Sequence, residues 1–90
     1  MKRIDRFYLY QPSTILQLPE DSHPLAIVEF DGQTCVEILY DVNAPRTDHV
    51  FHIFQTWGFP QPGLSLRHTG SILNPEQGIM KHVFEEVPSI

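Results

Sequence analysis

Hydrophobic and polar positions alternate in short runs along the chain, and clusters of turn residues separate the runs. The turn clusters lie at residues 11–13, 19–24, 31–32, 42–48, 58–63 and 74–78, where proline, glycine, asparagine and aspartate concentrate. The segments between them are about five to ten residues long, a length that is typical of strands and short for helices. The pattern therefore predicts an all-β fold.

The clearest local prediction is a β-hairpin over residues 25–40 that turns at Asp31-Gly32. Aspartate and glycine both tolerate the positive φ angles that a two-residue type I′ turn requires. The pairs that such a turn sets opposite one another are Phe30 with Gln33, Ile27 with Val36, and Leu25 with Ile38. Because the last two pairs form an apolar face, we expect this hairpin to be the centre of the fold.

A second hairpin is predicted over residues 67–84, with a five-residue loop at 74–78. In this register Leu73 pairs with Ile79, so His82 lies opposite Gly70 and diagonal to His68 on one face. Diagonal side chains of a strand pair are about 7–8 Å apart at Cα, a distance that two imidazole rings can span. Residues 4–10 and 14–18 are rich in β-branched, aromatic and leucine side chains, and we expect both to be strands.

The segment at residues 48–57 fits two structures. Four apolar side chains between residues 50 and 57 fall on one helical face, with Asp48 placed as the N-cap and Gly58 as the stop. The segment is nevertheless rich in Val, Ile, Phe and Thr and lacks Ala, Leu, Glu and Lys, which favours a strand. The prediction is a single domain over residues 1–90: a small antiparallel β-sandwich or partly closed barrel of about six strands, with one short helix as the alternative here.

Composition and charge argue against several classes of partner. The chain has 6 Lys and Arg against 11 Asp and Glu, a net charge of −5, and its bases are scattered, whereas nucleic-acid binding needs a concentrated basic surface. No apolar run approaches the roughly 18 residues of a membrane span, and the first residues are polar rather than an export signal. Cys35 is the single cysteine, so we expect a buried thiol and a cytoplasmic protein.

Several short motifs spread along the chain carry a resemblance to a known family. They are MKRI at residues 1–4, LQLP at 16–19, DG at 31–32, LYDVNAP at 39–45, FHIF at 51–54, TGS at 69–71 and HVFEE at 82–86. With these motifs the chain resembles a family of short, uncharacterised bacteriophage and prophage proteins that carry a domain of unknown function. It differs from that pattern in the region of residues 58–63, where Trp57, Phe59 and two prolines replace a plainer glycine turn. The resemblance implies a small all-β fold and a viral origin, and no activity.

Five histidines raise the possibility of a metal or acid–base site. His49 and His52 are three residues apart and would point to opposite faces of a strand. His68 and His82 supply two ligands, whereas a catalytic zinc site uses three from the protein. The chain also lacks HExxH, CxxC, nucleophile-elbow and phosphate-loop motifs. We therefore expect no catalytic residue, cofactor or tightly bound metal, and a small metal-dependent or hydrolytic enzyme is the last of three hypotheses.

The loop around Trp57 is the strongest candidate for recognition. Trp57 and Phe59 lie in a segment that Pro60 and Pro62 stiffen, and rigid aromatic side chains lose little entropy when they bind a partner. The alternative is that both rings fold back and close one end of the sandwich. Arg46, in the polar loop at 42–48, could hold a phosphate or carboxylate, or simply belong to a solvated turn.

Two hypotheses about function precede the enzyme hypothesis. The first is a non-enzymatic phage-encoded protein that binds and blocks a host protein, for example a component of host defence. The second is an oligomer that sequesters a small nucleotide signal through phosphate and base contacts. Unpaired edge strands also favour a homodimer. The candidate binding residues are Trp57, Phe59, Arg46, Arg67, His68 and His82.

Overall fold

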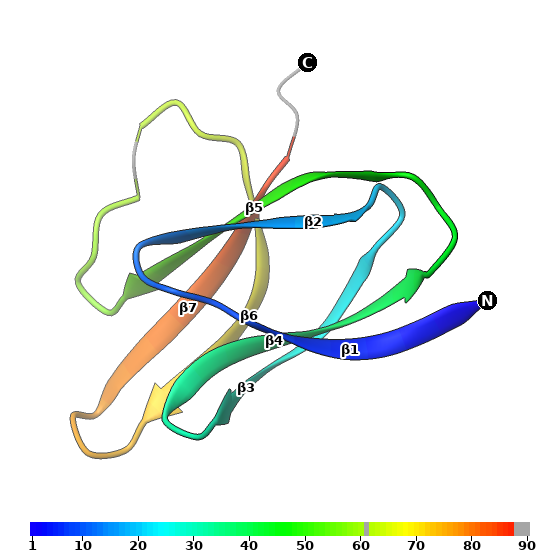
Figure 1. Cartoon of the computed structure of the whole chain (residues 1–90). Helices are drawn as coiled ribbons and strands as arrows, with labels where there is room; N and C mark the ends of the chain where they lie inside the picture. The colour runs from blue at the N-terminus through cyan, green and yellow to red at the C-terminus, as the bar shows by residue number, and fades with distance from the viewer. Residues whose placement is uncertain (61, 88–90) are drawn as a thin grey trace.

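A computed structural model describes residues 1–60 and 62–87. These residues form seven antiparallel strands and no helix (Figure 1). The strands are β1 (Lys2–Tyr8), β2 (Ser13–Pro19), β3 (His23–Phe30), β4 (Gln33–Asp41), β5 (Arg46–Gln55), β6 (Leu66–Asn74) and β7 (Ile79–Glu86). The predicted all-β class is thus confirmed. The count is seven rather than about six because the ambiguous segment is strand β5, and the helix alternative is wrong. Within these residues no helix could cross a membrane.

The strands form two sheets that pack as a sandwich and do not close into a barrel. One sheet has three strands in the order β1-β4-β3, and the other has four in the order β2-β5-β7-β6. Strand side chains alternate between the two faces of a sheet, so every second residue of the central strand β4 enters the core from Val36 to Tyr40. The core residues between the sheets are Leu9, Leu18, Val36, Ile38, Tyr40, Phe51, Ile53 and Val83.

The central hairpin has the predicted turn and most of the predicted register. Asp31 and Gly32 both have positive φ, at 54° and 75°, and the predicted pairs at Phe30 and Ile27 are confirmed. The pairing of Leu25 with Ile38 is wrong, because the register shifts between Pro24 and Ala26 and sets Pro24 opposite Ile38. Proline has no N–H for the ladder, and it is tolerated at an edge-strand irregularity of this kind.

Cys35, on the neighbouring strand β4, is a buried free thiol, as predicted. Burial raises the pKa of this thiol above its ordinary value.

The second hairpin differs from its prediction by one residue. Asn74, and not Leu73, pairs with Ile79, so the loop has four residues and His82 lies opposite Ser71 rather than Gly70. The cause lies in the turn, where the Gly78 N–H donates to the Asn74 carbonyl and Gly78 has a φ of 64°. A shift of one residue would move His68 to the other face, but a second irregularity between His68 and Gly70 returns it to the face of His82.

The two sheets approach most closely where β3 meets β6. A Cβ atom added to Gly70 would lie 2.6 Å from Cγ1 of Ile27 on the opposite sheet. Real Cβ atoms do not approach other carbons so closely, so only glycine fits at position 70 without movement of the strands.

We predict that Gly70→Ala lowers the free energy of unfolding by about 1–3 kcal/mol, the usual cost of overpacking. Denaturant unfolding of the variant measures this loss. In an Ile27→Ala background, which removes the Cγ1 atom, the same substitution should cost clearly less. An equal cost in both backgrounds would contradict the proposed contact.

Candidate binding surface

The outer face of the four-stranded sheet carries an alternating array of histidine and phenylalanine side chains. Phe51, Ile53 and Val83 point into the core, so their neighbours on β5 and β7 point outward. The register sets His52 opposite Phe84 and Phe54 opposite His82, and it sets His68 of β6 opposite Phe84. We call this surface the histidine–aromatic face, and its members are His52, Phe54, His68, His82 and Phe84.

The rings of this face contact one another continuously across three strands. His52 stacks on Phe54 with ring centroids 6.0 Å apart, and Phe54 is 5.8 Å from Phe84. His68 is 5.3 Å from Phe84 and 6.2 Å from His82. All four separations fall within the range of favourable aromatic pairs, so the face is a single packed layer.

Hydrogen bonds to two serines fix the orientation of the histidines. The Ser71 hydroxyl oxygen lies 2.8 Å from His68 Nε2 and 2.6 Å from His82 Nδ1. Since a hydroxyl has one proton, it donates to one of these rings and accepts an N–H from the other. On the neighbouring strands, Ser13 Oγ lies 2.7 Å from His52 Nδ1.

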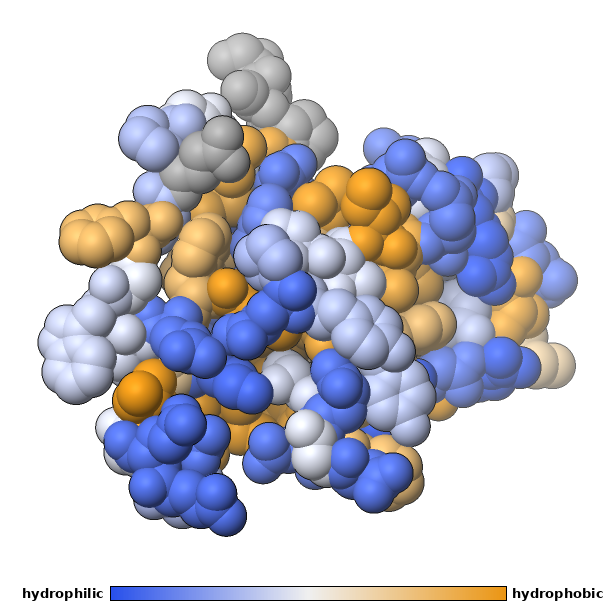
Figure 2. All heavy atoms as spheres, turned by 60° about the vertical axis from the view of Figure 1, so that its left-hand side comes forward, coloured by the Kyte–Doolittle hydropathy of each residue, from blue (hydrophilic) through white to orange (hydrophobic). Residues whose placement is uncertain are grey.

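The loop that follows β5 projects from the end of that strand (Figure 1), and it carries two exposed aromatic rings. Trp57 is 82% exposed and Phe59 is 91% exposed, so neither ring closes the sandwich, and the alternative that both rings fold back onto its end is wrong. Trp57 and Pro60 line a cleft of about 440 Å³ together with His82, Phe54 and Phe84 of the histidine–aromatic face. Gln61 of this loop lies outside the described residues. On the side of the molecule that Figure 2 presents, apolar groups reach the surface among hydrophilic ones.

Trp57 has an unfavourable backbone conformation. Its φ is 69°, a region that bulky L-residues avoid. Such a conformation costs on the order of 1–3 kcal/mol of stability. Because the ring is exposed, its packing does not offset this cost. Gly58, the next residue, has no room for a side chain, because a Cβ would lie 2.8 Å from the Gln55 carbonyl oxygen. The local backbone therefore holds the tryptophan outward at the expense of stability.

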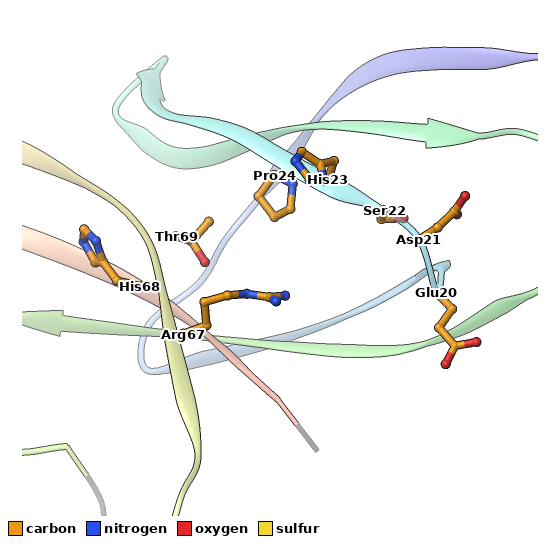
Figure 3. A pocket seen from close by; sticks show the side chains of 8 residues that line it. All are labelled: Glu20, Asp21, Ser22, His23, Pro24, Arg67, His68 and Thr69. Carbon is orange, nitrogen blue, oxygen red and sulfur yellow. The ribbon is translucent and has the colours of Figure 1, made fainter. Parts of the chain in front are cut away.

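Arg67 belongs to a different environment from that of the histidine–aromatic face. Its guanidinium donates to Glu85 Oε1 over 3.1 Å, and His49 Nδ1 lies 2.8 Å from the other oxygen of this buried carboxylate. Arg67 also lines a cleft of about 380 Å³ beside the turn at residues 20–24. His68 lines the same cleft, although its ring points away from the Arg67 side chain (Figure 3). His49 contacts Glu85, and His52 contacts Glu86. The two histidines lie on opposite faces of β5, as predicted for a strand.

Arg46 is the first residue of strand β5 and pairs with Pro19, so the polar loop predicted over residues 42–48 ends earlier than expected. Its guanidinium carbon lies 5.5 Å from the centroid of the Tyr40 ring, and its Nη1 donates to the Gln17 carbonyl over 3.1 Å. Below this ring the Tyr40 hydroxyl donates to Asp5, which also accepts two hydrogen bonds from Arg3. The Tyr40 hydrogen bond, followed by that of Arg3, holds the pKa of Asp5 below its usual value.

The structure therefore brings together some of the predicted binding residues and separates others. Trp57 and His82 share one cleft, and His68 lies beside His82. Arg46 and Arg67 do not line the Trp57 cleft, whereas Arg67 and His68 both line the cleft beside the turn at residues 20–24. His52, Phe54 and Phe84 were not predicted as binding residues, although their strict alternation with buried residues along β5 and β7 is the signal that identifies them.

Comparisons with known proteins add no relative. The sequence matches no protein-family model and no curated protein, and the structure matches no solved one. Within residues 1–60 and 62–87, no group of three or more His, Cys, Asp or Glu side chains is arranged to hold a metal ion.

The hydrogen bond from Tyr40 to Asp5 leads to a prediction about the pKa of Asp5. Tyr40→Phe removes the largest cause of the low Asp5 pKa, so this pKa should rise toward its ordinary value. An NMR titration of the Asp5 carboxyl carbon measures the change. A carboxyl group whose pKa is lowered by folding stabilises the protein above its unfolded-state pKa, and this stabilisation is lost as the pH falls through the lowered pKa. Above the unfolded-state pKa, Asp5 should therefore contribute less to the free energy of unfolding in Tyr40→Phe than in the unsubstituted protein. Tyr8→Phe is the control, and an unchanged Asp5 pKa in Tyr40→Phe would contradict the assignment.

Proposed function

We propose that this chain is a binding protein whose recognition surface consists of the Trp57 loop and the adjoining histidine–aromatic face, and that its target is a host protein. The observation that carries the proposal is the position of Trp57. Its ring is exposed, its backbone lies in an unfavourable region, and it borders an apolar cleft. A conformation that lowers stability without burying the ring is typical of a functional site.

The chemistry of this surface suits a protein partner. Tryptophan is enriched among the residues that dominate interface energies, and such residues act beside pockets that a partner side chain can fill. The cleft between Trp57 and Phe84 supplies such a pocket, and Phe59 is a second exposed aromatic residue of the same loop. The three imidazole rings both donate and accept hydrogen bonds, so they can satisfy polar groups of a partner around the apolar centre.

The nucleotide-sequestration hypothesis has weaker support. The stacked pair of His52 and Phe54 is a suitable platform for a base. The cations that would bind the phosphate, Arg46 and Arg67, are hydrogen-bonded to Gln17 and Glu85 and line no part of the Trp57 cleft. Mass spectrometry of small molecules released on denaturing the purified protein distinguishes the two hypotheses, since a stoichiometric nucleotide would favour the second.

We further propose a homodimer that forms through the outer face of the three-stranded sheet. Ile4, Tyr8 and Phe30 are each about half exposed there. Arg6 and Glu37 form an ion pair on the same face, so a second copy in two-fold orientation would present opposite charges to it.

The dimer is tested by light scattering at micromolar concentration, which should give a mass above that of the 10.4 kDa chain. Ile4→Glu should reduce this mass to that of the monomer, because it places a charge in the apolar contact. A monomer mass for the unsubstituted protein would contradict the proposal.

Two substitutions of Trp57 test the recognition loop. Trp57→Ala should change the free energy of unfolding little, and Trp57→Gly should raise it by up to about 1 kcal/mol, because glycine adopts the positive φ without strain. Both variants should lose about 2 kcal/mol or more of affinity for the target. Denaturant unfolding gives the first result, and titration calorimetry with the target gives the second.

The target is identified by affinity capture from host lysate with quantitative mass spectrometry, and the captured protein is then purified and assayed for inhibition. Tyr10→Ala is the matched control, since Tyr10 is 58% exposed and lies outside the Trp57 cleft. A loss of about 3–5 kcal/mol of stability in Trp57→Ala, the cost expected for a core aromatic, would overturn the proposal. Equal capture by Trp57→Ala and the unsubstituted protein would also overturn it.

A further inference from the structure

We propose that Ser13, His52 and Glu86 form an acyl-transfer site in which Ser13 is the nucleophile, and that this site takes carboxylic esters with small acyl groups. The inference goes beyond the proposed binding function and does not depend on it. It also differs from the expectation that the chain has no catalytic residue.

The three side chains have the order of contacts that nucleophilic catalysis by serine requires. Ser13 Oγ lies 2.7 Å from His52 Nδ1, and His52 Nε2 lies 2.8 Å from Glu86 Oε1. A hydroxyl, an imidazole base and a carboxylate that orients the base are thus connected through the two nitrogens of one ring. The residues come from strands β2, β5 and β7, which lie side by side in the sheet.

The exposure of the three groups suits their roles. Ser13 is exposed and can reach a substrate, whereas the His52 side chain is only 12% exposed and that of Glu86 is 35% exposed. Phe54 covers one side of the imidazole by stacking on it. Partial shielding from water strengthens the attraction between the carboxylate and the imidazolium that forms during the reaction.

The backbone at Ser13 offers a donor for the oxyanion. The Ile53 N–H donates to the Pro12 carbonyl over 2.9 Å, so Pro12 and Ile53 occupy a hydrogen-bonded position of the ladder. The next pair, Ser13 and His52, is then a non-hydrogen-bonded pair, and the Ser13 N–H points away from β5. Because β2 is an edge strand, this N–H faces the open side of the sheet, where it can bind the carbonyl oxygen of an ester.

A cleft for the acyl group begins at the residue that precedes Ser13. It has a volume of about 430 Å³ and is lined by Gln11, Pro12, Ile53, Phe54, Gln55 and Gly58. Pro12, Ile53 and Phe54 supply apolar walls for a short acyl chain, and the two glutamines supply polar groups beside it.

The reaction balances with an ester and water as the reactants. Ser13 Oγ attacks the ester carbonyl while its proton passes to His52 Nδ1, and Glu86 stabilises the imidazolium through Nε2. The C–O bond to the alcohol breaks, and the alcohol leaves with the proton from His52. Water then attacks the acyl-serine with His52 as the base, which releases the carboxylic acid and restores the Ser13 hydroxyl.

Ser71 provides a matched comparison on the same surface. Its hydroxyl is also bonded to imidazole nitrogens, those of His68 and His82, but among the described residues neither ring has a hydrogen bond to a carboxylate. If a carboxylate-oriented histidine is what activates the serine, Ser13 should react and Ser71 should not.

The experiment is acylation of the full chain with p-nitrophenyl acetate, followed by intact-mass measurement and peptide mapping. We expect one acetyl group per chain at Ser13 and labelling of the same residue by a fluorophosphonate probe. Ser13→Ala and His52→Gln should each reduce p-nitrophenol release by about 10²-fold, the lower range for general base catalysis. Ser71→Ala should leave the rate unchanged, and unfolding curves establish that each variant is folded.

Glu86→Gln separates an orienting role from a merely structural one. As a positioning residue Glu86 acts through His52, so the variant should lower the rate and move the pH profile of acylation to lower pH while the fold is retained. Acetylation at Ser71, at histidine or at lysine, with Ser13 unmodified, would overturn the proposal. Release of p-nitrophenol that is the same in Ser13→Ala would overturn it as well.

Discussion

The packing of Phe51, Ile53 and Val83 between the two sheets determines which side chains the protein presents to solvent. With these three side chains buried on β5 and β7, the alternation of strand residues directs their neighbours outward. The histidine–aromatic face is therefore a direct consequence of the core. A change that moved either strand by one residue would bury the imidazoles and expose the core, so the register of the four-stranded sheet preserves both stability and the surface.

The sequence predicts those parts of the fold that depend on local chemistry. The Asp31-Gly32 turn requires two residues that tolerate positive φ, and its hairpin was predicted almost entirely. The irregularities near Leu25 and Thr69 were not predicted, because they depend on how the sheets meet rather than on nearby residues. The irregularity near Thr69 lies beside the contact between Gly70 and Ile27, two residues that are distant in the sequence.

The candidate surface was predictable only in part, for the same reason. The proximity of His68 and His82 was expected from a register that is wrong by one residue, and it occurs because the irregularity near Thr69 compensates for the shift. Ser13, His52 and Glu86 come from three strands and form no motif in the chain, so only the pairing of β2, β5 and β7 assembles them. The exposed position of Trp57, in contrast, depends on neighbouring residues that prevent strand β5 from continuing.

The central claim is that the protein holds its single tryptophan outward beside an aromatic cleft rather than in the core. Steady-state fluorescence of Trp57 measures this directly, because no other tryptophan contributes to the signal. An exposed Trp57 in the folded protein without its partner should emit close to the wavelength of tryptophan in water. Acrylamide should quench it almost as efficiently as it quenches the free amino acid. Emission shifted to shorter wavelength, together with strong protection from acrylamide that is lost on unfolding, would contradict this claim.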